Sequence, residues 1–179
     1  MNITTSLLQK PSLQVQNCNE NILFCNNKCC EIKLGIYHTN KPHKHSHNNK
    51  KSGIFIYDKI KNKVLMVQSR GNLWGFPKGT MKNNETNTEC AIREVFEETG
   101  LVIHENELDS FTVIKDRSTY YFVYKDECPV VIQNHILGND ANSIGWINID
   151  CLEQLIKDKI IVLNQHSRIV FKRFIDKSF

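Results

Sequence analysis

Three glutamates in one short segment have the spacing of a cation site. Glu94, Glu97 and Glu98 stand at i, i+3 and i+4, which puts all three side chains on one face if the segment is helical. Like charges this close destabilise a bare helix, so the pattern suggests a bound cation. Carboxylates that hold Mg²⁺ can neutralise phosphate and activate water, which hydrolysis of a phosphoanhydride requires. A solvated acidic face is the alternative for glutamates that stand alone.

The residues around these glutamates follow a fixed pattern. From Gly79 the chain runs through five residues to Glu85 and through seven more to Arg93-Glu94-Val95-Phe96-Glu97-Glu98-Thr99-Gly100-Leu101. This run fills every fixed position of the Nudix box G-x5-E-x7-R-E-U-x-E-E-x-G-U, where U is a bulky aliphatic residue. The chain therefore resembles the Nudix hydrolase family.

The resemblance implies an enzyme that hydrolyses phosphoanhydride bonds with Mg²⁺ or Mn²⁺ as cofactor. It also implies an α/β (α+β) fold, an α/β/α sandwich with a mixed sheet and a loop-helix-loop box. The implied metal ligands are the three glutamates and the carbonyl of Gly79. Glu85 would brace the loop by pairing with Arg93, and Gly100 belongs to the same structural part of the box.

The approach to the box narrows the resemblance. Trp74-Gly75-Phe76-Pro77-Lys78-Gly79 precedes it, and together with the box this closely resembles the catalytic domain of the mRNA-decapping enzyme. That implies capped RNA as substrate and 7-methylguanosine diphosphate and 5′-monophosphate RNA as products. Lys78 could stabilise charge that develops on a phosphate oxygen, and Trp74 is a further candidate for substrate binding. A solvated loop lysine is the alternative for Lys78.

The general base has several candidates. In the decapping family a glutamate lies six residues before a Trp in the motif E-I-x-x-I-x-W, and here Asp140 takes its place before Trp146. Aspartate shortens the arm by one methylene but could still activate water. Glu97 or Glu98 could serve instead, and an ordinary loop aspartate remains the alternative for Asp140.

Charge is distributed unevenly along the chain. Residues 1–51 carry a net charge of +5 and residues 154–179 carry +4, and because the whole chain is +4 the part between them is −5. Basic ends beside an acidic, cation-binding middle suit a polyanionic substrate. Arg168, Lys172 and Arg173 are therefore candidate RNA contacts, which a merely solvated helix would explain nearly as well.

The N-terminal segment 1–51 is read as a basic arm with cysteine and histidine, and residues 52–179 as the Nudix domain. The arm ends in the polar run 40–51 and has no sustained period, apart from one short strand within 30–38. Its cysteines and histidines could supply a Zn²⁺ site: Cys25, Cys29, Cys30, His38, His43, His45 and His47. Their spacing fits no standard zinc motif, so a flexible arm is the preferred interpretation.

Periodicity predicts interleaved strands and helices around one core, hence a mixed α/β or α+β class. The expected strands cover residues 53–58, 64–68, 111–115, 119–125, 130–133 and 144–149, and residues 74–79 are expected to form a short strand that runs into a tight loop. The expected helices cover residues 87–99, 151–157 and 165–177. Thr86, Asn87 or Thr88 can cap the first helix, and Gly100 stands where a C′ glycine ends helices.

The sequence also bears on location and on alternatives. No apolar run could cross a bilayer and no secretory signal is visible, so we expect a cytoplasmic protein with free thiols and no membrane partner. The same box would serve a hydrolase of dinucleoside polyphosphates, diphosphoinositol polyphosphates or nucleoside triphosphates. A non-catalytic nucleotide- or RNA-binding module is a third reading. Nothing in the sequence predicts an oligomeric state.

Overall fold

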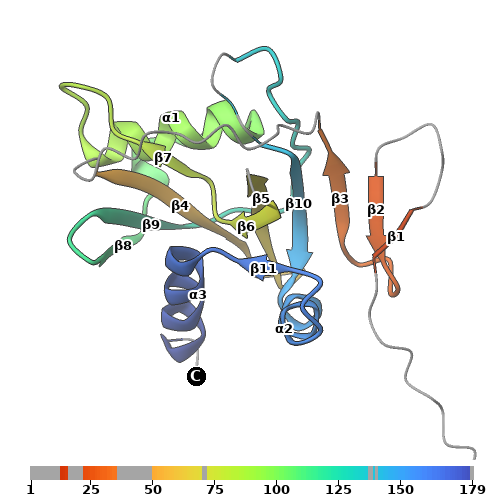
Figure 1. The fold of residues 1–179 in the computed structure, drawn as a ribbon. Coiled ribbons are helices and arrows are strands. Elements are labelled where there is room, and N and C mark those ends of the chain that lie inside the picture. The colour runs from red at the N-terminus through yellow and green to blue at the C-terminus, as the bar shows by residue number, and fades with distance from the viewer. Residues whose placement is uncertain are drawn as a thin grey trace, which may run out of the picture.

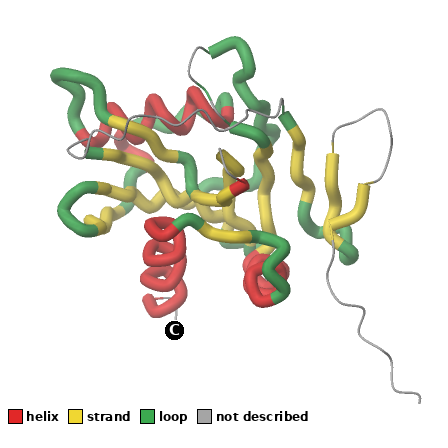
Figure 2. Tube along the Cα trace, viewed as in Figure 1, coloured by secondary structure: helices red, strands yellow, loops and turns green. Residues whose placement is uncertain are grey.

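The structure is a computed structural model that describes residues 13–15, 22–35, 50–69, 72–136, 139 and 141–177. A mixed sheet forms its middle layer, with strand order β1-β2-β3-β10-β5-β4-β9-β8. Helix α1 covers one face of this sheet, and α2 and α3 lie on the other (Figures 1 and 2). The predicted α/β/α sandwich with a mixed sheet is confirmed.

The central strands agree with the sequence prediction within one or two residues at each end. They are β4 (Lys51–Asp58), β5 (Lys63–Ser69), β8 (Ser110–Ile114), β9 (Ser118–Tyr124) and β10 (Ser143–Asn148). Strands β4 and β9 run parallel, from the pair Lys51 and Ser118 to the pair Tyr57 and Tyr124. Their neighbours on this path pair antiparallel, so the sheet is mixed.

Three short strands bring the box loop onto the sheet. They are β6 (Leu73–Gly75), β7 (Lys78–Thr80) and β11 (Val162–Leu163). Strand β7 pairs with the start of β4, where a Cβ on Gly53 would lie 2.3 Å from the carbonyl oxygen of Pro77. The glycine lets the loop pass this close, and the Ile54 N–H donates to that carbonyl at 3.0 Å. Lys78 and Gly79 are thereby fixed beside the sheet.

The helices begin and end where local chemistry dictates. Helix α1 (Asn87–Thr99) has Thr86 as N-cap in a capping box with Glu89, and it ends at Gly100 with φ of 71°. Helix α2 (Ile149–Lys157) begins two residues earlier than expected, because the Asn148 side chain caps it. Helix α3 (Gln165–Lys177) matches its prediction. No helix in the described ranges is long and apolar enough to cross a bilayer.

Side-chain alternation in the sheet divides the core into two layers. On β4, Ile54 and Ile56 join the layer under α1, while Phe55 between them joins the layer under α2 and α3. Ala91 and Val95 of α1 complete the first layer, and Phe55 lies 4.5 Å from Phe174 of α3, centroid to centroid, in the second. Burial on both faces thus holds the box helix and α3 in fixed positions.

The structure corrects two expectations. The short strand expected within residues 30–38 is present as β3 (Glu31–Leu34), but residues 22–35 are not otherwise irregular. Strand β2 (Ile22–Cys25) forms a hairpin with β3, β1 (Leu13–Val15) lies beside β2, and β3 pairs with β10. Residues 130–133 are not a strand. Val130 and Ile132 are buried and Val131 is exposed, so burial alternates as in a strand, but no ladder among the described residues includes them. The Val131 N–H donates to the Thr99 carbonyl of α1 instead.

Candidate active site

The loop that carries Lys78 and Gly79 lies directly against the carboxylates of α1. The backbone N–H of Lys78 donates to Oε2 of Glu98 at 3.0 Å. A Cβ built on Gly79 would lie 2.0 to 2.2 Å from the carboxylate atoms of Glu94. Glycine at position 79 leaves room for the Glu94 carboxylate, which any side chain there would displace.

Arg93 binds several residues of the box at once. Its Nε and Nη2 donate to the two oxygens of Glu85 at 2.6 and 2.9 Å, as a two-pronged ion pair. Its Nη1 donates to Glu94 at 2.7 Å and to Glu97 at 2.9 Å, and Nη2 also reaches the carbonyl of Thr80 at 3.2 Å. The predicted pair of Glu85 and Arg93 is present, and the same guanidinium also joins two of the predicted metal ligands.

Burial and charge act in opposite directions on these carboxylates. Burial raises the pKa of Glu94, and the hydrogen bond and charge of Arg93 only partly offset it. The hydrogen bond from Arg93 lowers the pKa of Glu85 to about 2. Glu85 is therefore an ionised partner of Arg93 at neutral pH, whereas the ionised form of Glu94 needs a nearby positive charge.

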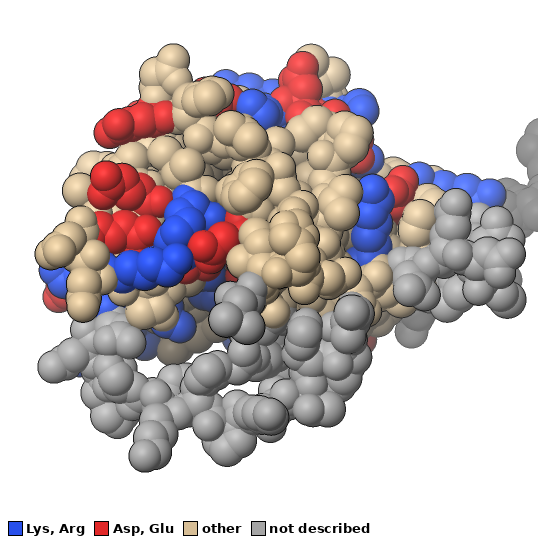
Figure 3. Space-filling view, turned by 90° about the horizontal axis from the view of Figure 1, so that it is seen from above, with Lys and Arg blue, Asp and Glu red and all other residues tan. Residues whose placement is uncertain are grey.

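The carboxylates fit a hard divalent cation. Glu94 and Glu97 converge on one guanidinium nitrogen, Glu98 is bonded to the loop of Gly79, and only glycine leaves room for Glu94 there. Oxygen ligands of this kind are those that Mg²⁺ and Mn²⁺ prefer. In the space-filling view onto this side of the molecule, acidic and basic side chains lie interleaved in a compact patch (Figure 3).

Comparison with known proteins agrees with this geometry, since a family model described as NUDIX domain matches residues 48–164. The chain belongs to the Nudix family. Protein 111R of Invertebrate iridescent virus 3 is 31% identical over 153 residues, which cover 78% of this chain and 86% of that protein. The mRNA-decapping enzyme subunit 2 of Arabidopsis thaliana is 29% identical over 107 residues, 57% of this chain but 28% of that protein.

A solved structure agrees on the fold. The bifunctional NMN adenylyltransferase/ADP ribose pyrophosphatase of Francisella tularensis, crystallised with AMP and a Mn ion, superposes with a TM-score of 0.55. The match covers 76% of this chain and 43% of that one at 19% identity. Together with the intact box, these comparisons support a pyrophosphohydrolase of the Nudix family.

Gly79→Ala offers a direct test of how tightly this Nudix site is packed. The new methyl group would meet the end of the Glu94 side chain, which can rotate away at small cost in stability but would leave its position. We expect activity to fall by roughly a hundredfold or more, with the melting temperature within about 3 °C of wild type. Ser110→Ala on β8 serves as control; equal activity of both variants would contradict the packing argument.

Lys51 of β4 and Lys115 in the turn after β8 place their charges near the same histidine as Lys78. Burial lowers the pKa of His166, at the start of α3, and the charges of Lys78, Lys51 and Lys115 lower it further. His166 Nδ1 lies 3.0 Å from the hydroxyl oxygen of Ser118. His166 and Lys51 belong to no motif and approach Lys78 only through the fold, so the sequence alone does not reveal them.

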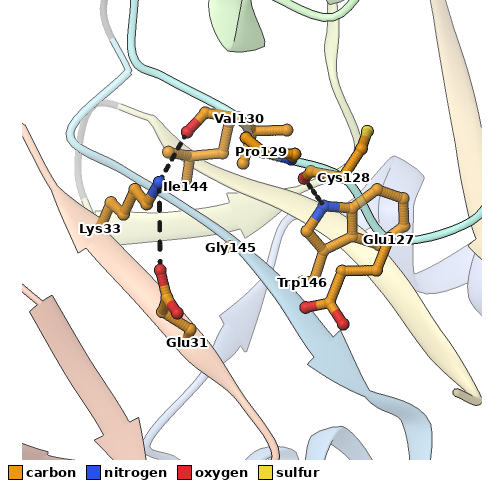
Figure 4. Close-up of a pocket in the computed structure, with 9 residues that line it drawn as sticks. All are labelled: Glu31, Lys33, Glu127, Cys128, Pro129, Val130, Ile144, Gly145 and Trp146. Carbon is orange, nitrogen blue, oxygen red and sulfur yellow. Dashed lines mark hydrogen bonds and ion pairs between the residues drawn. The ribbon is translucent and has the colours of Figure 1, made fainter.

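The two tryptophans of the motifs are core residues. Trp74 is 4% exposed and packs in the layer under α2 and α3, so its part in substrate binding stays a prediction that would require the side chain to become more exposed. Trp146 is 3% exposed, and its N–H donates to the carbonyl of Cys128 at 2.9 Å. It lines a hollow of about 270 Å³ between β3, β10 and residues 127–130 (Figure 4). No lining residue of this hollow belongs to the box.

The other predicted site residues lie as follows. Arg168 and Lys172 are exposed on α3. Arg173 is also exposed, but its Nη1 donates to the hydroxyl of Thr112 and, at 3.0 Å, to the carbonyl of Val113, which ties α3 to β8. Asp140 lies outside the described residues, as do His38, His43, His45 and His47. On the solvent side of Glu97, the Nζ of Lys82 lies 3.3 Å from Oε1 of Glu97.

Proposed function

We propose that this chain is a Nudix pyrophosphohydrolase that removes the 5′ cap of mRNA, releasing 7-methylguanosine diphosphate and 5′-monophosphate RNA. The observation that carries the proposal is the bond between the Lys78 N–H and Glu98. It holds the loop of the decapping-like approach against the carboxylate helix. The family and the name of the Arabidopsis relative support it, and a substrate of this kind implies a cytoplasmic location.

The three helix glutamates are the proposed metal ligands, and one of them is also the proposed general base. Glu94, Glu97 and Glu98 would hold Mg²⁺ or Mn²⁺ with the carbonyl of Gly79, and the bound cation would neutralise phosphate charge and lower the pKa of water. Glu98 lies at the loop and would accept the proton of the attacking water, with Glu97 able to replace it. Asp140 is the remaining candidate for this proton.

Lys78 is the proposed contact to the phosphate chain. Its charge acts together with those of Lys51 and Lys115 on His166, so several positive groups border the acidic cluster from the side of β4 and α3. A triphosphate bridge carries negative charge along its length and would be held between this border and the cations. His166 in its neutral form could donate or accept one further hydrogen bond.

Lys78→Ala is expected to lower kcat by roughly tenfold to a thousandfold on every phosphoanhydride substrate, because one positive charge that faces the leaving phosphate is lost. Lys157→Ala on α2 removes an exposed lysine away from the box and is the matched control. Steady-state rates with capped RNA measure both. If the two variants hydrolysed at the same rate, Lys78 would be only a solvated loop lysine.

Contacts beyond the cap can be tested on α3. Arg168 and Lys172 are four residues apart, so both can lie on one face of the helix and meet the RNA backbone. The double variant Arg168→Ala/Lys172→Ala should weaken binding of capped RNA about tenfold at low salt. It should also reduce the slope of log K against log salt concentration by about one to two. Hydrolysis of a free cap dinucleotide should not change. An unchanged salt slope would remove α3 from the RNA path.

A panel of substrates separates the remaining alternatives. Cap-labelled RNA, free cap dinucleotide, diadenosine polyphosphates, nucleoside triphosphates and diphosphoinositol polyphosphates are each incubated with the protein and Mg²⁺ or Mn²⁺. Cleavage of capped RNA in preference to free cap is the expected result. Faster cleavage of a small molecule would identify that molecule, and not the cap, as the substrate. No turnover of any of them would favour a nucleotide- or RNA-binding module.

A further inference from the structure

Four cysteine thiols converge on one point far from the box. Cys25 ends β2, Cys29 and Cys30 precede β3, and Cys151 lies in the first turn of α2. Their Sγ atoms all lie within 4.8 Å of one another. Cys25, Cys30 and Cys151 are buried, and Cys29 is partly exposed. The fold thus unites residues that stand more than a hundred positions apart in the chain.

The distances within the cluster have the size of a metal tetrathiolate. Cys29 Sγ lies 3.4 Å from that of Cys25, 3.8 Å from that of Cys30 and 3.3 Å from that of Cys151. Four sulfurs at about 2.3 Å from one Zn²⁺ stand about 3.8 Å apart in a tetrahedron. A disulfide would need a separation of about 2.05 Å. Ordinary packing of cysteine as a small apolar group does not require four sulfurs to point at each other.

The backbone around the thiols is built to bring them together. The Lys28 N–H donates to the Cys25 carbonyl at 2.9 Å, and Lys28 has a positive φ of 54°. This tight turn reverses the chain after β2, so Cys29 and Cys30 return towards Cys25. The N–H of Asn148 donates to Cys30 Sγ at 3.4 Å, a contact of the kind that orients a metal-binding sulfur. Cys151, in the first turn of α2, brings the fourth thiol to the same point.

We propose that Cys25, Cys29, Cys30 and Cys151 bind one structural Zn²⁺ that fastens the β2–β3 hairpin to α2. On binding, the four thiols lose their protons to solvent and four Zn–S bonds form, so no oxidant is needed. An all-sulfur, four-ligand set selects Zn²⁺ over Mg²⁺, which prefers oxygen. The set differs from the cysteine and histidine ligands considered for the arm, because its fourth member comes from the Nudix domain.

The hairpin gives the zinc a clear structural role. Within the described chain, β3 forms its ladders with β2 and β10 only. A hairpin of two short strands with little core of its own is marginally stable, so its attachment beside β10 needs reinforcement. The hollow of Figure 4 depends on this placement, since Glu31 and Lys33 of β3 form one of its walls. Zinc would fix the hairpin, the start of α2 and this wall as one unit.

The test uses the full chain, expressed with added zinc and purified under reducing conditions without chelator. Elemental analysis should find one zinc per chain in wild type and in Cys128→Ser, the control for loss of a thiol outside the cluster. Cys29→Ser and Cys151→Ser should each lose most of the zinc. Glu98→Gln should keep it, which separates this site from the box and from the proposed hydrolysis. Wild type with no bound zinc after reconstitution would overturn the proposal.

A second measurement uses wild type alone, so it tests the proposal even if the cysteine variants fail to fold. Wild type reconstituted with Co²⁺ should show the intense visible bands of a tetrahedral cobalt thiolate, and a titration should saturate at one ion per chain. Removing zinc with a strong chelator should lower the melting temperature by about 5 °C or more, and returned zinc should restore it. A disulfide between Cys29 and Cys151 in the protein as purified, or octahedral cobalt spectra, would contradict a tetrathiolate site.

Discussion

Glu98→Gln is expected to lower kcat by at least roughly a thousandfold on every pyrophosphate substrate that the protein hydrolyses, about 4 kcal/mol in the barrier. The amide keeps the size of the side chain, and its oxygen can still accept the Lys78 N–H that Glu98 binds at 3.0 Å. It loses both the negative charge that a cation needs and the site that would accept a proton. Turnover under saturating Mg²⁺ measures the change.

The fold should survive this substitution. Glu98 is not among the three carboxylates that Arg93 holds, so all of the contacts between Arg93 and these carboxylates remain. We expect the melting temperature of Glu98→Gln to stay within about 3 °C of wild type. Glu153→Gln on α2 is the matched control and should keep full activity. Normal turnover by Glu98→Gln would mean that other residues accept the proton and bind the cation. Asp140 would then be the next residue to test.

Local chemistry explains why the box helix could be predicted almost to the residue. Thr86 and Glu89 form a capping box, and Gly100 adopts the left-handed conformation that ends a helix. These signals lie within a few residues of the element they define, so one sequence suffices to find them. The alternation of Ile54, Phe55 and Ile56 across two core layers is local in the same way.

Features that depend on distant partners could not be predicted. The β2–β3 hairpin is held by β10, more than a hundred residues later, so the sequence predicts only the short strand that β3 forms and not β2 or the pairing. Cys151 looks like a single cysteine until the fold places it 3.3 Å from Cys29. Val130 and Ile132 alternate in burial like a strand, since an extended loop packed on a core has the same period.

Part of the active site could be predicted, because some of its contacts are local in the sequence. The box pattern names Glu85, Arg93 and the metal-binding candidates, because their spacing is fixed by one loop and one helix. It does not reveal that Arg93 also binds Glu94 and Glu97. Nor does it find His166, whose relation to Lys78 and Lys51 depends on how α3 packs against the sheet.

Arg93→Gln is expected to lower the free energy of unfolding by about 3 kcal/mol, or the melting temperature by roughly 6 to 12 °C. The change breaks the two-pronged pair with Glu85, whose side chain is 11% exposed, and leaves Glu94 and Glu97 without their shared guanidinium. Chemical denaturation at pH 7 measures the loss. Arg168→Gln, an exposed arginine on α3, should change stability by less than about 0.5 kcal/mol.

The pH dependence of this loss identifies its source. The pKa of Glu85 is lowered to about 2 from an ordinary value of 4.5, so its ion pair stabilises the fold above pH 4.5 and the contribution disappears as pH falls towards 2. The stability difference between wild type and Arg93→Gln should therefore shrink over this interval. Arg93→Lys keeps the charge but cannot bind two oxygens of Glu85 at once, so an intermediate loss is expected. A difference independent of pH would show that Arg93 acts by packing rather than through Glu85.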